Sequence, residues 1–144
     1  MRIVLDTSAI LAVGFDEADA DTYQSALEML HRPFISAVTL FEMRTVLAFR
    51  KGQDVLTTME LAFARWNTEV VPFDEGQASA AFQAYRRYGK GTGHRAKLNF
   101  ADCAAYALAR SVDAPLLFNG NDFNHTDVTP ALPLLVPEAG GRTL

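Results

Sequence analysis

The stretch that decides the fold is Ile3-Val4-Leu5-Asp6-Thr7-Ser8-Ala9, near the beginning of the sequence. Its first three residues are apolar without alternation, which is typical of a short strand covered by helices on both faces. The carboxylate of Asp6 follows the strand, and the apolar residues 9–13 predict that a helix starts soon after it. Ligands of parallel α/β sheets bind beyond the carboxyl ends of the strands, so Asp6 stands where chemistry is expected.

The rest of the chain repeats this alternation of short apolar runs and longer helical stretches. Further strands are predicted at residues 34–35, 70–71, 116–118 and 134–136. Helical spacing of apolar residues predicts helices over 19–31, 37–51, 54–66, 75–88 and 99–112. Ser36 suits the N-cap of the second of these helices, and Gly52 marks its end. The pattern predicts one α/β domain over residues 1–144, with helices flanking a short, mostly parallel sheet.

Composition is that of an ordinary globular protein. The chain has 144 residues, of which 49% are hydrophobic and 21% charged. Its net charge of −4 argues against nucleic-acid binding through overall charge, so any such contact requires a local patch. The single cysteine, Cys103, excludes an internal disulfide, and no apolar stretch is long enough to cross a bilayer. We therefore expect a cytoplasmic protein with neither a membrane span nor a signal peptide.

Four acidic residues stand at places that an α/β fold brings together, namely Asp6, Glu42, Asp102 and Asp122. Three of them follow a predicted strand or lie in the first turn of a predicted helix. Carboxylates that converge on one pocket repel each other and need a cation. Carboxylate oxygens are the ligands that Mg²⁺ and Mn²⁺ prefer, and such sites carry out phosphodiester chemistry. The sequence thus predicts a metal-dependent nuclease.

Each acid also has a simpler interpretation. Asp6 can stabilise a helix N-terminus, and Asn99 with Asp102 has the spacing of a helix cap. Asp122 and its neighbour Asp127 can both be turn residues. Glu42 is harder to explain, because it shares a predicted apolar stripe whose other members are Val38, Val46 and Phe49. Burying a glutamate there costs several kcal/mol unless the carboxylate is paired or bound to a metal.

One segment reverses the acidic balance of the chain. Between Arg86 and Lys97 there is no acidic residue, but there are five Lys and Arg residues and one histidine: Arg86, Arg87, Lys90, His94, Arg95 and Lys97. Three glycines within residues 89–93 indicate an irregular loop. Two interpretations remain open at this point, a mobile solvated loop or a flexible basic lip that holds a polyanion near the carboxylates.

The chain resembles the PIN-domain ribonucleases of the VapC toxin type, and the resemblance covers nearly its whole length. The motifs that carry it are residues 3–9, Ser36-Ala37-Val38-Thr39-Leu40-Phe41-Glu42, Leu98-Asn99-Phe100-Ala101-Asp102-Cys103-Ala104, and residues 116–123 followed by Thr126-Asp127-Val128. Two departures are small, since Ala101 stands where glycine is frequent and Asn119 where lysine is often found. The resemblance implies a three-layer α/β/α sandwich.

The resemblance also implies an activity and partners. Such proteins are metal-dependent endoribonucleases, usually homodimers, that are held inactive by a small cognate antitoxin of a type II pair. Asp6, Asp102 and Asp122 would bind Mg²⁺ or Mn²⁺, with Glu42 acting directly or through water. Thr7 or Ser8 would hydrogen-bond a ligand carboxylate or a metal-bound water, and Asn99 would orient Asp102. The fourth acid is either Asp122 or Asp127.

Two other functions fit the same acids. One is a small metal-dependent phosphatase, although no lysine lies beyond the other strand ends to support a phosphoaspartate mechanism. The second is a non-catalytic binding module whose acids dock a basic partner, and which would tolerate loss of metal. The chain also has more large apolar residues than a core obviously requires, among them Phe41, Phe49, Phe63 and Trp66. Core packing is the expected place of most of them, and any that stay exposed favour self-association.

Overall fold

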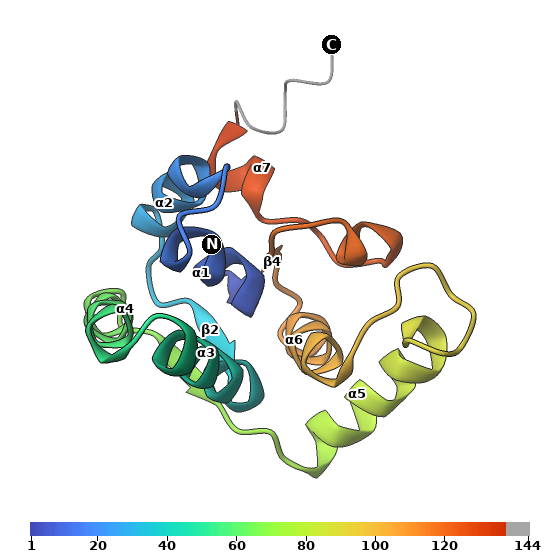
Figure 1. Ribbon diagram of the computed structural model, residues 1–144. Coiled ribbons are helices and arrows are strands. Elements are labelled where there is room, and N and C mark those ends of the chain that lie inside the picture. Colours follow the sequence, from blue (N-terminus) through green and yellow to red (C-terminus); the bar gives the residue numbers. More distant parts are fainter. Residues whose placement is uncertain (138–144) are drawn as a thin grey trace.

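Four short strands form the centre of the computed structural model (Figure 1), which describes residues 1–137. They are β1 (Val4–Leu5), β2 (Phe34–Ser36), β3 (Glu69–Val71) and β4 (Leu116–Leu117). Their order in the sheet is β3-β2-β1-β4, and all neighbouring strands are parallel. The carboxyl ends of β1, β2 and β4 therefore meet at one edge of the sheet, where the acidic residues were expected.

The helices connect these strands and cover both faces of the sheet (Figure 1). Their bounds are α1 (Thr7–Gly14), α2 (Ala20–Glu28), α3 (Ala37–Arg50), α4 (Gln53–Arg65), α5 (Glu75–Tyr88), α6 (Phe100–Ser111), the 3₁₀ helix η1 (Asp122–His125) and α7 (Leu132–Leu135). The predicted caps are confirmed, since the Ser36 hydroxyl accepts a hydrogen bond from the Val38 backbone N–H at 3.2 Å. None of the helices in the described part has the length and apolar composition needed to cross a membrane.

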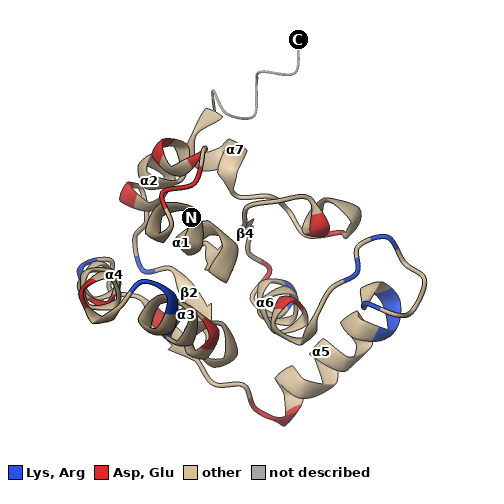
Figure 2. Cartoon of the chain, in the orientation of Figure 1, with Lys and Arg blue, Asp and Glu red and all other residues tan. Residues whose placement is uncertain are grey.

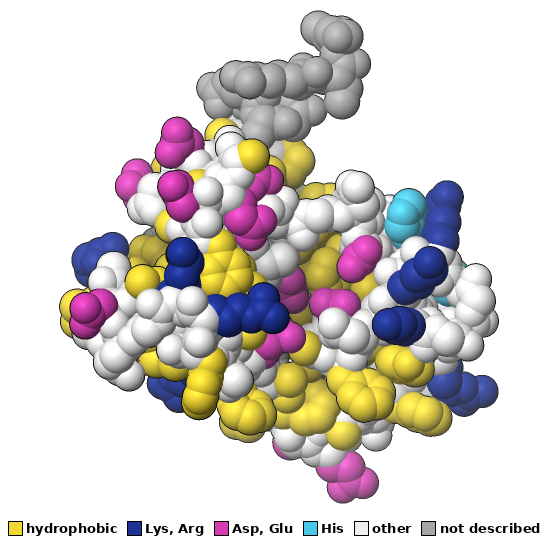
Figure 3. Space-filling model, in the orientation of Figure 1, with side chains coloured by type: hydrophobic (Ala, Val, Ile, Leu, Met, Phe, Trp, Pro, Cys, Tyr) yellow, Lys and Arg dark blue, Asp and Glu magenta, His cyan; other side chains and the backbone are white. Residues whose placement is uncertain are grey.

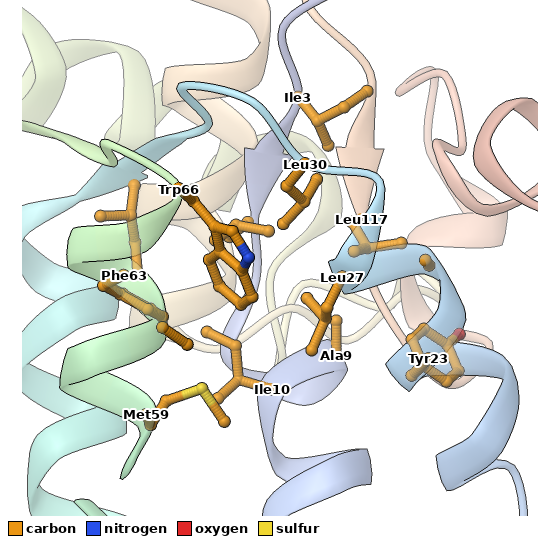
Figure 4. Packing of buried hydrophobic residues seen from close by; sticks show 14 of the residues in the cluster. Ile3, Ala9, Ile10, Tyr23, Leu27, Leu30, Met59, Phe63, Trp66 and Leu117 are labelled. Atoms are coloured by element: carbon orange, nitrogen blue, oxygen red, sulfur yellow. The ribbon is translucent and has the colours of Figure 1, made fainter. Parts of the chain in front are cut away.

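Two hydrophobic clusters lie on opposite faces of the sheet because successive strand residues alternate between the faces. In β1 and just before it, Ile3 and Leu5 belong to one cluster, and Val4 belongs to the other. The first cluster joins the sheet to α1, α2, α3 and α4, and Figure 4 shows Trp66 and Phe63 packed beside Ile10. The second joins it to α5 and α6. The predicted three-layer α/β/α arrangement is confirmed.

Helix α6 differs from its expected pattern. The helical spacing of Phe100, Cys103, Ala104, Ala107 and Leu108 predicts one apolar stripe, with Asp102 directed away from the core. Instead, residues 103–109 are all buried, whereas Phe100 is 82% exposed. The cause is the small side chain of alanine at four of these positions, which lets neighbouring elements approach α6 from nearly every side. Asp102 lies at the rim of this buried helix and is itself partly buried.

The prediction of a strand at residues 134–136 is wrong. The place beside β4 is taken by the preceding residues, because Leu116 forms a parallel bridge with Pro130. The chain then turns into α7, in which the N–H groups of Leu134 and Leu135 both donate to the carbonyl of Ala131. Pro133 fits the first turn of that helix, where its missing N–H has no helical partner to lose. The end of the predicted domain, residues 138–144, lies outside the described part.

Helix α2 is also shorter than predicted. It ends at Glu28 rather than at residue 31. The N–H groups of Met29 and Leu30 donate to the carbonyls of Ala26 and Leu27, so the chain tightens into a turn before Pro33 is reached. The other predicted helices lie within two residues of their observed bounds, as expected for capped, periodic segments.

Candidate functional site

The four predicted acids lie on four different elements. Asp6 directly follows β1 and caps α1, Glu42 lies on α3, Asp102 lies in the first turn of α6, and Asp122 begins η1 after β4. Acidic residues on α3 and α6 face the middle of the molecule (Figure 2), and the space-filling view shows acidic side chains in a hollow at the centre of one face (Figure 3).

Asp6 is held firmly in place by Ser8. The carboxylate oxygen Oδ2 of Asp6 accepts hydrogen bonds from the Ser8 backbone N–H at 3.1 Å and from the Ser8 hydroxyl at 2.5 Å. The same hydroxyl accepts a hydrogen bond from the backbone N–H of Asn119 at 2.9 Å. Ser8 therefore ties the acid at the end of β1 to the segment that leaves β4. It occupies the orienting role predicted for Thr7 or Ser8.

Thr7 does not take that role in this arrangement. Its hydroxyl oxygen is buried and has no hydrogen-bond partner within the described residues. The serine, one residue further along α1, has both the acid and the Asn119 backbone within reach. Asn119 was noted in the sequence only as a departure from a motif, and no local pattern predicts this contact because it spans most of the chain.

Burial and nearby negative charges destabilise the ionised form of Asp6. Burial, together with the charges of Asp102 and Glu42, raises the pKa of Asp6 to about 7, although the Ser8 hydrogen bonds pull it down. The side chain is only 5% exposed, so water does little to screen these charges. Asp6 is thus a buried carboxylate. None of the described groups that shift its pKa is a cation.

Asp102 is perturbed in the same direction. Burial raises the pKa of Asp102 to about 6, with additional contributions from the charges of Asp122 and Glu42. One oxygen accepts a hydrogen bond from the Asn99 backbone N–H at 3.0 Å, and the Asn99 side chain accepts one from the Asp102 N–H at 2.8 Å. This reciprocal capping box holds Asp102 as predicted. Capping and repulsion by other acids therefore act on the same carboxylate.

The apolar stripe that was predicted to include Glu42 is not the face of α3 that packs into the core. The face of α3 that enters the core carries Thr39, Met43 and Leu47, whereas Glu42 lies beside it and is half-buried. Phe49, which was placed on the same apolar stripe, is 89% exposed. Glu42 is therefore at the edge of the core, where its charge reaches both Asp6 and Asp102.

Asp127 belongs to a different cluster. Its oxygen Oδ1 accepts a hydrogen bond from the Tyr106 hydroxyl at 2.5 Å, and its oxygen Oδ2 lies 3.7 Å from Arg87 and 3.9 Å from Arg110. Partial burial pulls the pKa of Asp127 upward, but Tyr106, Arg110 and Arg87 together hold it below its usual value. Asp122, and not Asp127, is the acid whose charge acts on Asp102. Sequence reasoning missed Tyr106 and Arg110, which only tertiary packing brings to Asp127.

The acids suit a divalent cation by chemistry, although they are not closed around one. Within residues 1–137, no three Asp, Glu, His or Cys side chains lie close enough to hold a metal ion together. Burial nevertheless raises the pKa of both Asp6 and Asp102, and the charges of neighbouring acids, among them Glu42, raise it too. A pocket of oxygen donors whose charges repel each other fits a hard cation such as Mg²⁺ or Mn²⁺, which also takes water ligands.

The basic segment, residues 86–97, is tied down rather than loose. Gly89 and Leu98 form a parallel bridge, and the Lys90 N–H donates to the Leu98 carbonyl at 2.9 Å. The Tyr85 hydroxyl donates to the Lys90 carbonyl at 2.6 Å, and the backbone N–H of Ala96 donates to His94 Nδ1 at 3.0 Å. These contacts give the backbone of the segment a defined path, and its flexibility stays a prediction.

The charges of this segment differ in their surroundings. The Lys and Arg side chains of this segment are all exposed: Arg86, Arg87, Lys90, Arg95 and Lys97. Arg87 also lies over the Tyr88 ring at 4.8 Å and beside Asp127. Figure 2 shows these Lys and Arg residues at the end of α5 and along the loop that follows it.

Comparison with known proteins agrees with the predicted fold and family. The PIN-domain family matches residues 3–128. The ribonuclease VapC30 of Mycobacterium tuberculosis is 42% identical over 132 residues, which are 91% of this chain and 100% of VapC30. The chain therefore belongs to the PIN-domain family and, within it, to the VapC ribonucleases. The predicted family is confirmed.

Solved structures support the same fold at lower identity. VapC20 of Mycobacterium tuberculosis, described as a toxin that cleaves the sarcin–ricin loop, has a TM-score of 0.73 at 18% identity, over 88% of this chain and 96% of VapC20. The VapBC2 structure of Rickettsia felis, bound to a DNA fragment from its promoter, contains a chain with a TM-score of 0.70 at 17% identity, over 90% of this chain and 96% of that one.

The raised pKa values lead to a prediction about stability in EDTA. The folded chain binds the Asp6 and Asp102 protons more tightly than the unfolded chain between about pH 4 and pH 7. These two groups should therefore make stability fall as pH rises through that window, with no further loss above it. Asp102→Asn keeps the capping geometry and removes one charge, so it should raise the melting temperature at pH 7.5 by a few degrees.

Asp127→Asn is the matched control, with the opposite expected sign. It removes a carboxylate that lies between Arg87 and Arg110, so the melting temperature in EDTA should fall. Thermal melts of the wild-type chain and both variants, followed by circular dichroism, check the prediction. A lower melting temperature for Asp102→Asn than for the wild-type chain would mean that Asp102 acts only as a helix cap.

Proposed function

We propose that this chain is a metal-dependent endoribonuclease that acts in the cytoplasm as the toxin of a type II toxin–antitoxin pair. The observation that carries the proposal is the buried carboxylate of Asp6, which directly follows β1 and lies in the field of Asp102 and Glu42. Membership of the VapC ribonucleases supports RNA as the substrate. Structural neighbours that are toxins or toxin–antitoxin complexes support the biological role.

Asp6, Asp102 and Asp122 would hold Mg²⁺ or Mn²⁺, and Glu42 would bind directly or through water. Such an ion, when bound, makes hydroxide available from water near neutral pH and offsets charge on the attacked phosphate. The protein's own contribution is to keep the carboxylates oriented. Ser8 holds the carboxylate of Asp6, and Asn99 holds that of Asp102, through hydrogen bonds.

Activity should depend strictly on the cation and on the acids. Purified protein should cleave RNA with Mg²⁺ or Mn²⁺, and EDTA should abolish the cleavage. Asp6→Asn and Asp102→Asn each remove a ligand charge but preserve shape and capping hydrogen bonds, so each should lower the cleavage rate by at least about a hundredfold. Gel analysis of a labelled structured RNA measures this effect.

Asp127→Asn is again the control, because Asp127 lies in another cluster and its loss should leave most of the cleavage rate intact. If Asp6→Asn and Asp102→Asn cleave RNA at nearly the wild-type rate, the proposed metal site is wrong. Cleavage that persists in EDTA would contradict it as well.

We propose that the basic segment holds the RNA backbone and does no chemistry. Its exposed cations are Arg86, Arg87, Lys90, Arg95 and Lys97, and the half-buried His94 lies between them in the sequence. Two hydrogen bonds and a backbone bridge keep the loop beside Asn99, and thus beside the helix that carries Asp102. Arg87 contributes less, because Asp127 already engages it.

The salt dependence of RNA binding tests this role. Each lost phosphate contact with single-stranded RNA should lower the slope of log affinity against log salt by about 0.7. Lys90→Ala combined with Arg95→Ala should therefore flatten the slope by about 1.4 if each of the two side chains contacts a phosphate. Arg65→Ala, on the exposed side of α4, should leave the slope unchanged. An unaltered slope in the double variant would make the segment an ordinary solvated loop.

We also propose that the chain forms a homodimer and binds a small cognate antitoxin. Exposed Phe41 and Phe49 on α3 supply apolar surface beside the acids, to which a basic antitoxin segment is electrostatically complementary. Light scattering should give twice the chain mass at micromolar concentration. A monomer at every concentration tested would contradict the dimer, and failure to copurify with the product of an adjacent small gene would contradict the antitoxin.

A further inference from the structure

An apolar groove of about 480 Å³ adjoins the acidic site. It lies between α5 and α6, with one wall from the start of α3. Its lining has no charged side chain and consists of Val38, Phe73, Ala78, Ala81, Phe82, Tyr85, Phe100, Cys103 and Ala104. Figure 3 shows hydrophobic side chains covering the surface immediately beside the central acids. The proposed metal chemistry uses none of these residues.

The groove shares its walls with both charged regions of the molecule. Phe100 and Cys103 flank Asp102 in the first turn of α6, and Val38 lies one turn before Glu42 on α3. On the other side, the ring of Tyr85 lies 5.5 Å from that of Phe100, and its hydroxyl donates to the carbonyl of Lys90. The groove thus lies between the acids and the root of the basic segment, residues 86–97.

Aromatic faces in this groove are left open to solvent. Phe100 is 82% exposed and Phe82 is 59% exposed, so neither ring is needed to fill the core. The volume lies in the range of about 300 to 1,000 Å³ that is typical of pockets for single small ligands. A stable protein interface needs about 800 Å² from each partner, which is a broader surface than one groove.

The arrangement of charged residues around the groove indicates what kind of ligand the groove binds. A single RNA strand carries phosphates on its backbone and flat, uncharged bases beside them. The basic segment suits the phosphates, the acids suit a cation at the cleaved phosphate, and the apolar aromatic groove between them suits a base. Sequence-specific RNA recognition commonly stacks unpaired bases on exposed aromatic side chains.

We propose that this groove stacks one unpaired nucleobase of the RNA next to the phosphodiester that is cleaved, with Phe100 as the principal stacking residue. The inference rests on the proposed ribonuclease function and adds a specificity-determining contact to it. Phe100 holds the substrate strand in register with Asp102, two residues away on the same helical turn. RNA whose base is paired at that position is excluded from the groove.

Fluorescence anisotropy in EDTA measures the affinity for a labelled oligoadenylate. Comparison with a ligand that lacks bases distinguishes the contribution of base stacking from that of backbone contacts. Base-to-aromatic stacking is worth about 1–3 kcal/mol by alanine substitution, so Phe100→Ala should weaken binding on the order of tenfold to a hundredfold. The comparison ligand is the same sugar–phosphate chain without bases. This base-free chain carries the same charge as the oligoadenylate, and Phe100→Ala should not change the affinity of the protein for it. Phe100→Tyr should retain oligoadenylate binding, and Phe100→Leu should not.

Leu61→Ala is the control, since Leu61 is a 62% exposed apolar residue on α4 that does not line the groove. Equal losses for both ligands, or none, in Phe100→Ala would overturn the inference, as would a change in oligomeric state without a change in RNA affinity. The latter result would assign the groove to a protein partner. Metal-dependent cleavage by the wild-type chain is measured separately, so failure of the ribonuclease function and failure of base stacking are distinguishable.

Discussion

Burial of the Asp6 carboxylate at the carboxyl end of β1, within the field of other acids, is the constraint on which the site depends. Asp6 is 5% exposed and lies in the field of Asp102 and Glu42, so its charged form is costly in the isolated chain. Ser8 holds the carboxylate and is held in turn by the Asn119 backbone, which fastens the end of β1 to the end of β4. The fold therefore holds these carboxylates near each other, and a bound cation would offset their negative charge.

Basic residues are concentrated in a separate segment near this acidic site. The chain is acidic overall, yet residues 86–97 carry no acid, and their backbone is fastened beside α6. Gly89 is required there by close approach, because a Cβ atom at this position would lie 2.4 Å from the Tyr85 carbonyl oxygen. The apolar groove lies between the two charged regions. Acids, aromatic rings and cations thus follow each other across one face, an order that suits a single nucleic-acid strand.

Sequence reasoning failed where long-range packing decided between equivalent local patterns. Residues 134–136 have the composition of a strand, but Pro130 had already taken the pairing position beside β4. Asp122 and Asp127 both follow the same strand, and only the positions of Tyr106 and Arg110 separate a site acid from an acid in a structural ion cluster. Phe100 has the spacing of a core residue on α6 and is nevertheless exposed, because the alanines after it fill the core instead.

The sequence by itself determined the α/β class, nearly all of the helices and strands, the capping of α3 and α6, and the acids that approach each other. These features depend on local chemistry, namely apolar runs, caps and the position of an acid after a strand or in a helix's first turn. Tertiary structure alone decided that Ser8 rather than Thr7 holds Asp6, that Arg87 is engaged by Asp127, and that an open aromatic groove adjoins the acids. Such contacts join residues far apart in the chain, so their geometry exists only after the layers have packed.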